Sequence, residues 1–179
     1  MKNNASFSWK ELSKLLRKSA AFTVLMFLVF SQFPTRFIAY ASAPGSVVIN
    51  EVAWAGSGDS STDEWIELYN NLNQSVDLTN WTINDDNGSS LYTISSGTIP
   101  AHGYFLIEDH ETAVSTVMAD ALIDLSLANT GDSLELFDQG GQSMDVVNSG
   151  GGAWAAGSSV SKATMERVDA AVSGDLAAN

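Results

Sequence analysis

The chain has 179 residues, with 21 acidic side chains, eight basic ones and no cysteine, and its formal net charge is −13. The lack of cysteine excludes the disulfide framework of many small secreted domains, so the fold depends on its apolar core. A surface this acidic disfavours nucleic-acid binding, which relies on cations that displace counterions from phosphate.

The N-terminus has the pattern of an export signal. Residues 1–18 carry five basic side chains against one acid, the apolar run 20–30 follows, and residues 41–43 fit the A-x-A cleavage rule. The apolar run is shorter than the roughly 20 residues that span a bilayer. We therefore expect residues 1–43 to be a signal peptide and the protein to be secreted or held at the cell surface. The alternative is an uncleaved anchor, which would be the one contact of the chain with a membrane.

Cleavage after Ala43 changes the charge of the remaining chain. Lys162 and Arg167 are then the only cations against 20 acids, a net charge of −18. The 136 residues that remain are enough to bury the core of one domain.

From residue 46 onward, apolar residues alternate with polar ones in short segments separated by turn residues, which is typical of an all-β domain. A single helical turn competes within 109–126, and 138–142 is expected to be a hairpin loop. The Gly/Ser/Ala-rich stretch 148–160 is expected to be a loop or linker. We expect Trp154 in it to fold back over a core edge, the alternative being exposure for a partner. Residues 169–179 are expected to be a flexible tail or the start of a downstream region. The expected strands are 46–54, 64–70, 80–85, 91–95, 103–109, 121–126, 133–138, 143–148 and 162–168.

The segment 61–70, STDEWIELYN, raises the question of whether its acids are catalytic. Strand alternation places Ile66 and Leu68 on the core face and Trp65, Glu67 and Tyr69 on the other. Glu64 and Glu67 then lie on opposite faces, whereas a catalytic carboxylate pair must face one bond. The spacing favours a structural role.

The strand 46–54 follows the same rule. Alternation predicts Asn50, Val52 and Trp54 on one face, with Ile49, Glu51 and Ala53 on the other. Because Arg167 is the only arginine after the export segment, we expect it to pair with Glu51 or Glu67.

Calcium binding is the main functional alternative, because acidic loops offer the oxygen ligands that calcium prefers. The stretch 84–90 lacks the spacing of an EF-hand loop. Nucleophilic and zinc chemistry are disfavoured, since cysteine is absent and the two histidines stand outside any known motif. The calcium candidates are Asp59, Asp63, Asp85, Asp86, Asp109 and Glu111.

Five blocks of this sequence together resemble a known family. In order and spacing they are similar to the bacterial branch of the lamin-tail domain family, over roughly residues 46–168. The resemblance implies an immunoglobulin-like β-sandwich without catalytic residues. The blocks are VVINEVAWAG, DEWIELYNNLNQSVDLTNWTI, IPAHGYFLI, LANTGDSLELFDQGGQSMDVV and ATMERV.

We therefore expect a non-enzymatic interaction or architectural module of an exported or cell-surface bacterial protein, without a cofactor, whose partner is an unidentified protein or surface polymer. Two alternatives stay open. One is a calcium-dependent adhesion or carbohydrate-binding module, and the other is an accessory domain of an exported nuclease or hydrolase.

Overall fold

The computed structural model describes residues 42–179 except 86–89, 111–112, 115 and 176–178. These residues belong to one compact unit, Ala41–Asn179. The predicted export segment lies almost wholly outside them. No helix in the described part of the chain is long and apolar enough to cross a membrane.

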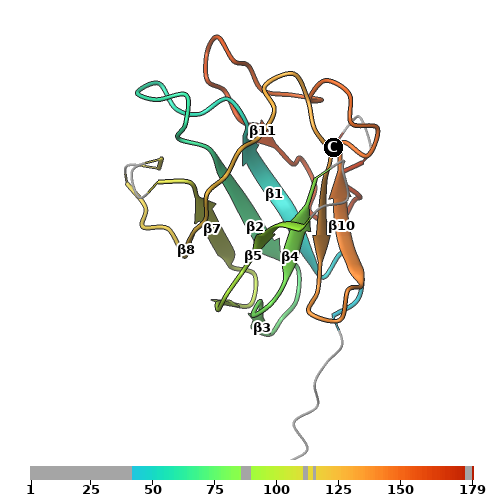
Figure 1. Ribbon diagram of the computed structural model, residues 1–179. Coiled ribbons are helices and arrows are strands. Elements are labelled where there is room, and N and C mark those ends of the chain that lie inside the picture. Colours follow the sequence, from blue (N-terminus) through green and yellow to red (C-terminus); the bar gives the residue numbers. More distant parts are fainter. Residues whose placement is uncertain (1–41, 86–89, 111–112, 115, 176–178) are drawn as a thin grey trace, which may run out of the picture. The chain divides into compact units, whose positions relative to one another are not determined.

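The described residues form strands and no α-helix, as expected for an all-β chain (Figure 1). The predicted helical turn within 109–126 is not seen in the part of that segment that is described. The strands are β1 Val47–Ala53, β2 Trp65–Asn70, β3 Val76–Asp77, β4 Thr82–Asn84, β5 Ser90–Thr93, β6 Thr98–Ile99, β7 Tyr104–Glu108, β8 Ala121–Leu122, β9 Leu134–Phe137, β10 Ser143–Val147 and β11 Met165–Glu166.

Two sheets face each other and make an immunoglobulin-like sandwich. One has the strand order β11-β1-β2-β7-β8 and the other β10-β9-β4-β5, while β3 and β6 form a small ribbon. The hairpin predicted at 138–142 joins β9 to β10. The expected strand at 121–126 is reduced to β8, which pairs with β7 in parallel.

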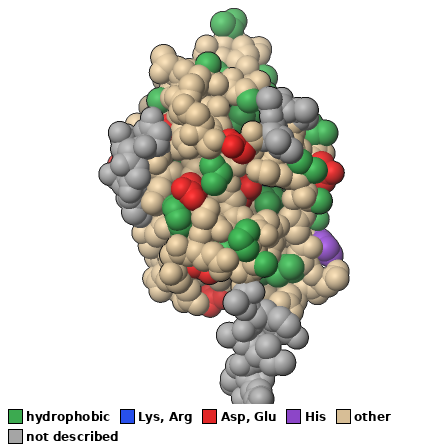
Figure 2. Space-filling view, turned by 90° about the vertical axis from the view of Figure 1, so that its right-hand side faces the viewer, with side chains coloured by type: hydrophobic (Ala, Val, Ile, Leu, Met, Phe, Trp, Pro, Cys, Tyr) green, Lys and Arg blue, Asp and Glu red, His purple; other side chains and the backbone are tan. Residues whose placement is uncertain are grey.

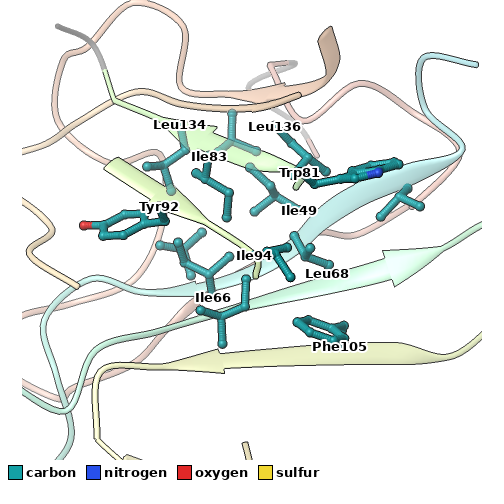
Figure 3. Packing of buried hydrophobic residues seen from close by; sticks show 14 of the residues in the cluster. Ile49, Ile66, Leu68, Trp81, Ile83, Tyr92, Ile94, Phe105, Leu134 and Leu136 are labelled. Carbon is teal, nitrogen blue, oxygen red and sulfur yellow. The ribbon is translucent and has the colours of Figure 1, made fainter. Parts of the chain in front are cut away.

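The core lies between the two sheets (Figure 3). Ile66 and Leu68 of β2 are fully buried, as strand alternation predicts, and they pack with Ile83 of β4 and Leu136 of β9 in one apolar cluster. Burial of such side chains is worth about 1.5–3 kcal/mol each and is the main force that holds the sheets together.

The faces predicted for β1 are wrong, because the strand contains a β-bulge. The register with β2 shifts between Ile49 and Glu51, so Asn50 is the extra residue. Ile49 and Val52, predicted on opposite faces, therefore both join the core, where they are 1% exposed.

Trp154 folds back onto the sandwich, as expected. Its ring stacks on Trp54 with a centroid distance of 6.2 Å and an interplanar angle of 11°. Its indole N–H donates to the Ala128 carbonyl over 2.8 Å. Gly157 lies so close to Trp54 that a Cβ on it would come within 2.6 Å of the indole nitrogen. The Gly-rich loop is thus fitted around the two tryptophans.

The seam between β1 and β10 contains a buried ion pair. The Arg167 guanidinium contacts Asp145 of β10, and their side chains are only 3% and 5% exposed. Asp145 also accepts the backbone N–H of Ile49 in β1 over 2.9 Å, and Arg167 donates to the Ile49 carbonyl over 2.9 Å. Burial raises the pKa of Asp145, while the facing Arg167 opposes the rise. Arg167 also donates to the Val172 carbonyl, so the pair joins both sheets to the residues near the C-terminus.

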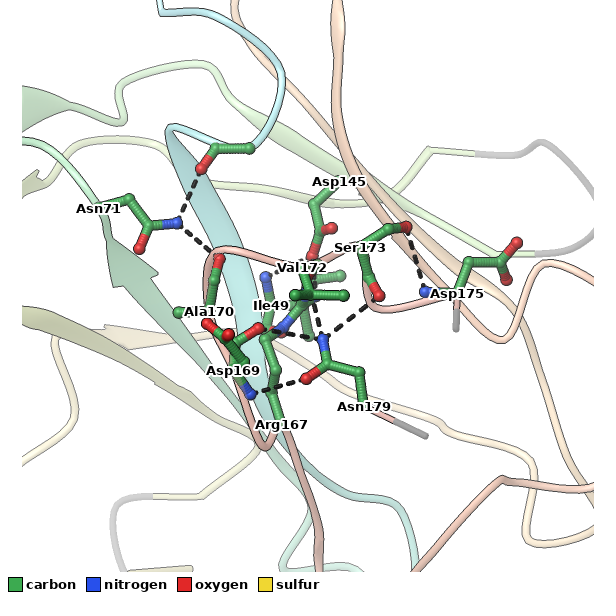
Figure 4. A network of polar contacts seen from close by, with 11 residues as sticks. Ile49, Asn71, Asp145, Arg167, Asp169, Ala170, Val172, Ser173, Asp175 and Asn179 are labelled. Atoms are coloured by element: carbon green, nitrogen blue, oxygen red, sulfur yellow. Dashed lines mark hydrogen bonds and ion pairs between the residues drawn. The ribbon is translucent and has the colours of Figure 1, made fainter. Parts of the chain in front are cut away.

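The C-terminal segment, residues 169–175 with Asn179, for which the sequence predicts a flexible tail or the start of a downstream region, packs on the sandwich (Figure 4). Asn71 donates to the Ala170 carbonyl over 2.8 Å. The Asp175 carboxylate accepts from the Ser149 N–H and hydroxyl, each over 2.7 Å. These side-chain hydrogen bonds hold the segment on the sandwich, although it forms no strand.

Replacing Arg167 by Met should lower the free energy of unfolding by about 3–5 kcal/mol, because it leaves the Asp145 charge buried without its partner. Lys162→Met is the matched control, since Lys162 is the other cation of the described chain and makes one hydrogen bond, to the Ala55 carbonyl. Urea unfolding of both variants measures the difference. Equal losses would show that the buried pair has no special weight.

Candidate functional site

Glu64, directly before β2, is a structural acceptor. It is 6% exposed, and its carboxylate accepts the backbone N–H of Leu127 over 2.7 Å. Burial raises the pKa of Glu64 to about 7, the hydrogen bond from Leu127 opposes the rise, and the nearby Asp109 adds to it. A raised pKa in a pocket often marks a catalytic acid. Here the carboxylate instead accepts a hydrogen bond from the backbone of the loop that contains Leu127.

Other carboxylates around the 113–127 segment have the same role. Asp109 accepts the Leu125 N–H over 3.1 Å, and Glu108 accepts the Val114 N–H over 3.2 Å. Asp120 accepts the Leu106 N–H over 2.8 Å. Side-chain acceptors thus satisfy backbone donors that no sheet partner reaches. The acids hold this irregular crossover against β7.

The calcium candidates are not brought together. Asp63 accepts the Ser57 hydroxyl within the loop where the Asp59 N–H also donates to Ser57, and Asp109 holds Leu125. Asp85 follows β4. Asp86 and Glu111 lie outside the described residues. Among the residues described, no three His, Asp or Glu side chains gather as a metal site would require.

The expected partners of Arg167 are wrong. Glu51 accepts from the Thr164 hydroxyl, and Glu67 accepts from the Asn50 side-chain amide over 2.8 Å. Both acids lie on the outer face of the sheet. Glu67 does so by the regular alternation of β2, and Glu51 does so because the bulge at Asn50 leaves Ile49 and Val52 to the core. Arg167 reaches the seam instead and pairs with Asp145.

The outer face of the five-stranded sheet is the candidate functional surface. Its register aligns Glu166 of β11 opposite Glu51 of β1, and Glu51 opposite Glu67 of β2. Residues directly opposite share a face and lie about 4.5–5.5 Å apart. Burial raises the pKa of Glu51 and Glu67, and Coulombic repulsion by Glu166 adds to both shifts. We call these three residues the carboxylate row.

Two tyrosines continue this face. Tyr69 of β2 lies opposite Tyr104 of β7, with ring centroids 5.0 Å apart and an interplanar angle of 46°. Tyr104 is 54% exposed. The tyrosine pair follows the carboxylate row on the same face of β2, since Tyr69 is two residues after Glu67.

No free cation accompanies these acids among the described residues. Lys162 donates to the Ala55 carbonyl, and Arg167 is buried in its pair. Figure 2 shows one face of the molecule, on which described Asp and Glu side chains are visible and Lys and Arg are not. The outer face therefore carries negative charge that no free cation of the described residues neutralises.

Sequence reasoning placed Trp65, Glu67 and Tyr69 together on the outer face of β2, but it missed the carboxylate row and the tyrosine pair. Both depend on which strands are neighbours. The alternating pattern of each strand shows which residues share a face of that strand, but it does not determine the register between neighbouring strands.

The two facing sheets define an immunoglobulin-like β-sandwich domain. The sequence pattern of the Lamin Tail Domain family matches residues 40–151, so the chain belongs to that family. No individual curated protein matches the chain significantly.

The titration of Glu64 yields a test. Its folded pKa lies above its ordinary value of 4.5, so the native state binds more protons than the unfolded one between these values, and stability falls as the pH rises through that range. Glu64→Gln keeps an acceptor for Leu127 but does not ionise. We expect the variant to gain on the order of 2 kcal/mol relative to wild type between pH 5 and pH 8.

Urea unfolding across this pH range measures the gain. Glu135→Gln, which removes one charge from β9 of the other sheet, is the control and should follow the wild-type pH dependence. If Glu64→Gln also runs parallel to wild type, the carboxylate does not titrate in this window.

Proposed function

We propose that this chain is a non-catalytic interaction module of an exported or cell-surface bacterial protein. The observation that carries the proposal is the outer face of the β11-β1-β2-β7 sheet, where the carboxylate row and the tyrosine pair lie side by side. Glu64 and Asp109 accept from loop backbone and Asp145 pairs with Arg167, whereas this face keeps charge and aromatic surface directed outward.

Membership in the Lamin Tail Domain family, whose fold is immunoglobulin-like, supports a non-catalytic module, and the N-terminal sequence supports export. A domain held together without disulfides is compatible with export when its core is large enough. Its strong negative charge keeps copies of the module apart. The module therefore acts on a different molecule, a protein or a surface polymer.

Export has a direct test. When the full chain is expressed in a bacterial host, we expect it outside the cytoplasm, with its N-terminus at Pro44 by mass spectrometry. An Ala41→Lys, Ala43→Lys double variant should block processing, because cleavage requires small side chains at these positions. An intact wild-type chain that stays in the cytoplasm would contradict export, and one that stays in the membrane would identify an anchor.

The effect of calcium on stability distinguishes this proposal from a calcium-dependent adhesion module. We expect the unfolding temperature of residues 44–179 to be the same in millimolar calcium and in millimolar magnesium at fixed ionic strength, because charge screening does not distinguish the two ions. A bound ion at ~100 times its Kd would add about 2.7 kcal/mol. A rise specific to calcium would contradict the proposal and favour the acidic loops.

A further inference from the structure

The tyrosine pair is an unpartnered part of the outer sheet face. Tyr104 is 54% exposed although it is the first residue of an inner strand of the sheet. Its ring is tilted by 46° against the ring of Tyr69, with the ring centroids 5.0 Å apart. Tyrosine combines a large apolar area with few rotatable bonds, which makes it an effective contact residue at interfaces.

The neighbouring carboxylate row determines the charge of a molecule that lies on this face. Like charges directly opposite each other on adjacent strands destabilise a sheet, and the row contains two such pairs, Glu51 with Glu67 and Glu51 with Glu166. The donors that reach it, Thr164 and Asn50, are neutral. A cationic ligand would relieve this repulsion, whereas an anionic one would add to it.

Aromatic rings beside carboxylates match the chemistry of lysine and arginine. The apolar stem of such a side chain covers a ring, the cation is attracted to the ring face, and the head group reaches a carboxylate. A neutral sugar would use the rings but not the carboxylates. A second copy of this chain is repelled, since the chain after Ala43 has a net charge of −18 from two cations and 20 acids.

We propose that the face formed by the tyrosine pair and the carboxylate row docks a Lys/Arg-rich extended segment of a partner protein. The proposal rests on the proposed function and names the partner class of that module. Successive basic side chains of an extended segment that point the same way are about 6.5–7 Å apart, which is the spacing between Tyr69 and Glu67 along β2. Basic side chains at alternate positions of the partner thus meet a ring and then a carboxylate.

The test is fluorescence anisotropy of a labelled ten-residue peptide of alternating Arg and Gly with the exported chain in about 150 mM salt. We expect saturable binding that weakens about threefold or more in Tyr104→Ala and in Glu166→Gln. Tyr104→Phe should retain binding, since the ring is what acts. The control Glu135→Gln removes one charge from the other sheet and should bind like wild type.

Each other result would overturn the proposal in a different way. Equal weakening by Glu135→Gln would show attraction to overall charge without a docking face. Binding of a neutral chitin tetramer that is lost in Tyr104→Ala, with no peptide binding, would assign the face to carbohydrate and leave the interaction module intact. Binding of neither probe by a correctly exported chain would refute the docking face alone, whereas failure of export would refute the proposed function itself.

Discussion

The buried pair of Asp145 and Arg167 is the interaction on which the arrangement of this domain depends. A core between two sheets does not by itself fix how their edges meet, because apolar contact has no direction. Here the Asp145 carboxylate accepts from the Ile49 backbone and from the Arg167 guanidinium. Arg167 also donates to the Val172 carbonyl. The pair therefore connects β10, β1 and the C-terminal segment. Removing one member leaves a buried charge, which is why the seam tolerates little change.

The small number of cations also determines how the acidic side chains are satisfied. With Lys162 and Arg167 already engaged, most carboxylates have no basic side chain to meet, and the structure gives several of them backbone N–H groups instead. Glu64, Glu108 and Asp109 thereby hold one irregular crossover. A negatively charged chain can stay compact this way because each bond satisfies a donor that would otherwise be buried unpaired.

The outer sheet face differs from these regions, because its carboxylates repel each other across strands. Family membership establishes the sandwich, but fold alone does not state what a domain binds. Tyr69 and Tyr104 lie beside Glu67, and the described residues hold no free cation, so this face favours a basic partner. Such a face gains most from a ligand that supplies positive charge and an apolar stem together.

The sequence alone determined the fold class and the core of β2, because period-two alternation with Ile66 and Leu68 reports directly which side is buried. It also predicted the 138–142 hairpin and the return of Trp154. It failed at the β1 bulge and at the partner of Arg167. A bulge reverses the alternation without a mark in composition, and an ion pair depends on which strands meet. Register and neighbours, set by tertiary packing, decided that three glutamates and two tyrosines share one face.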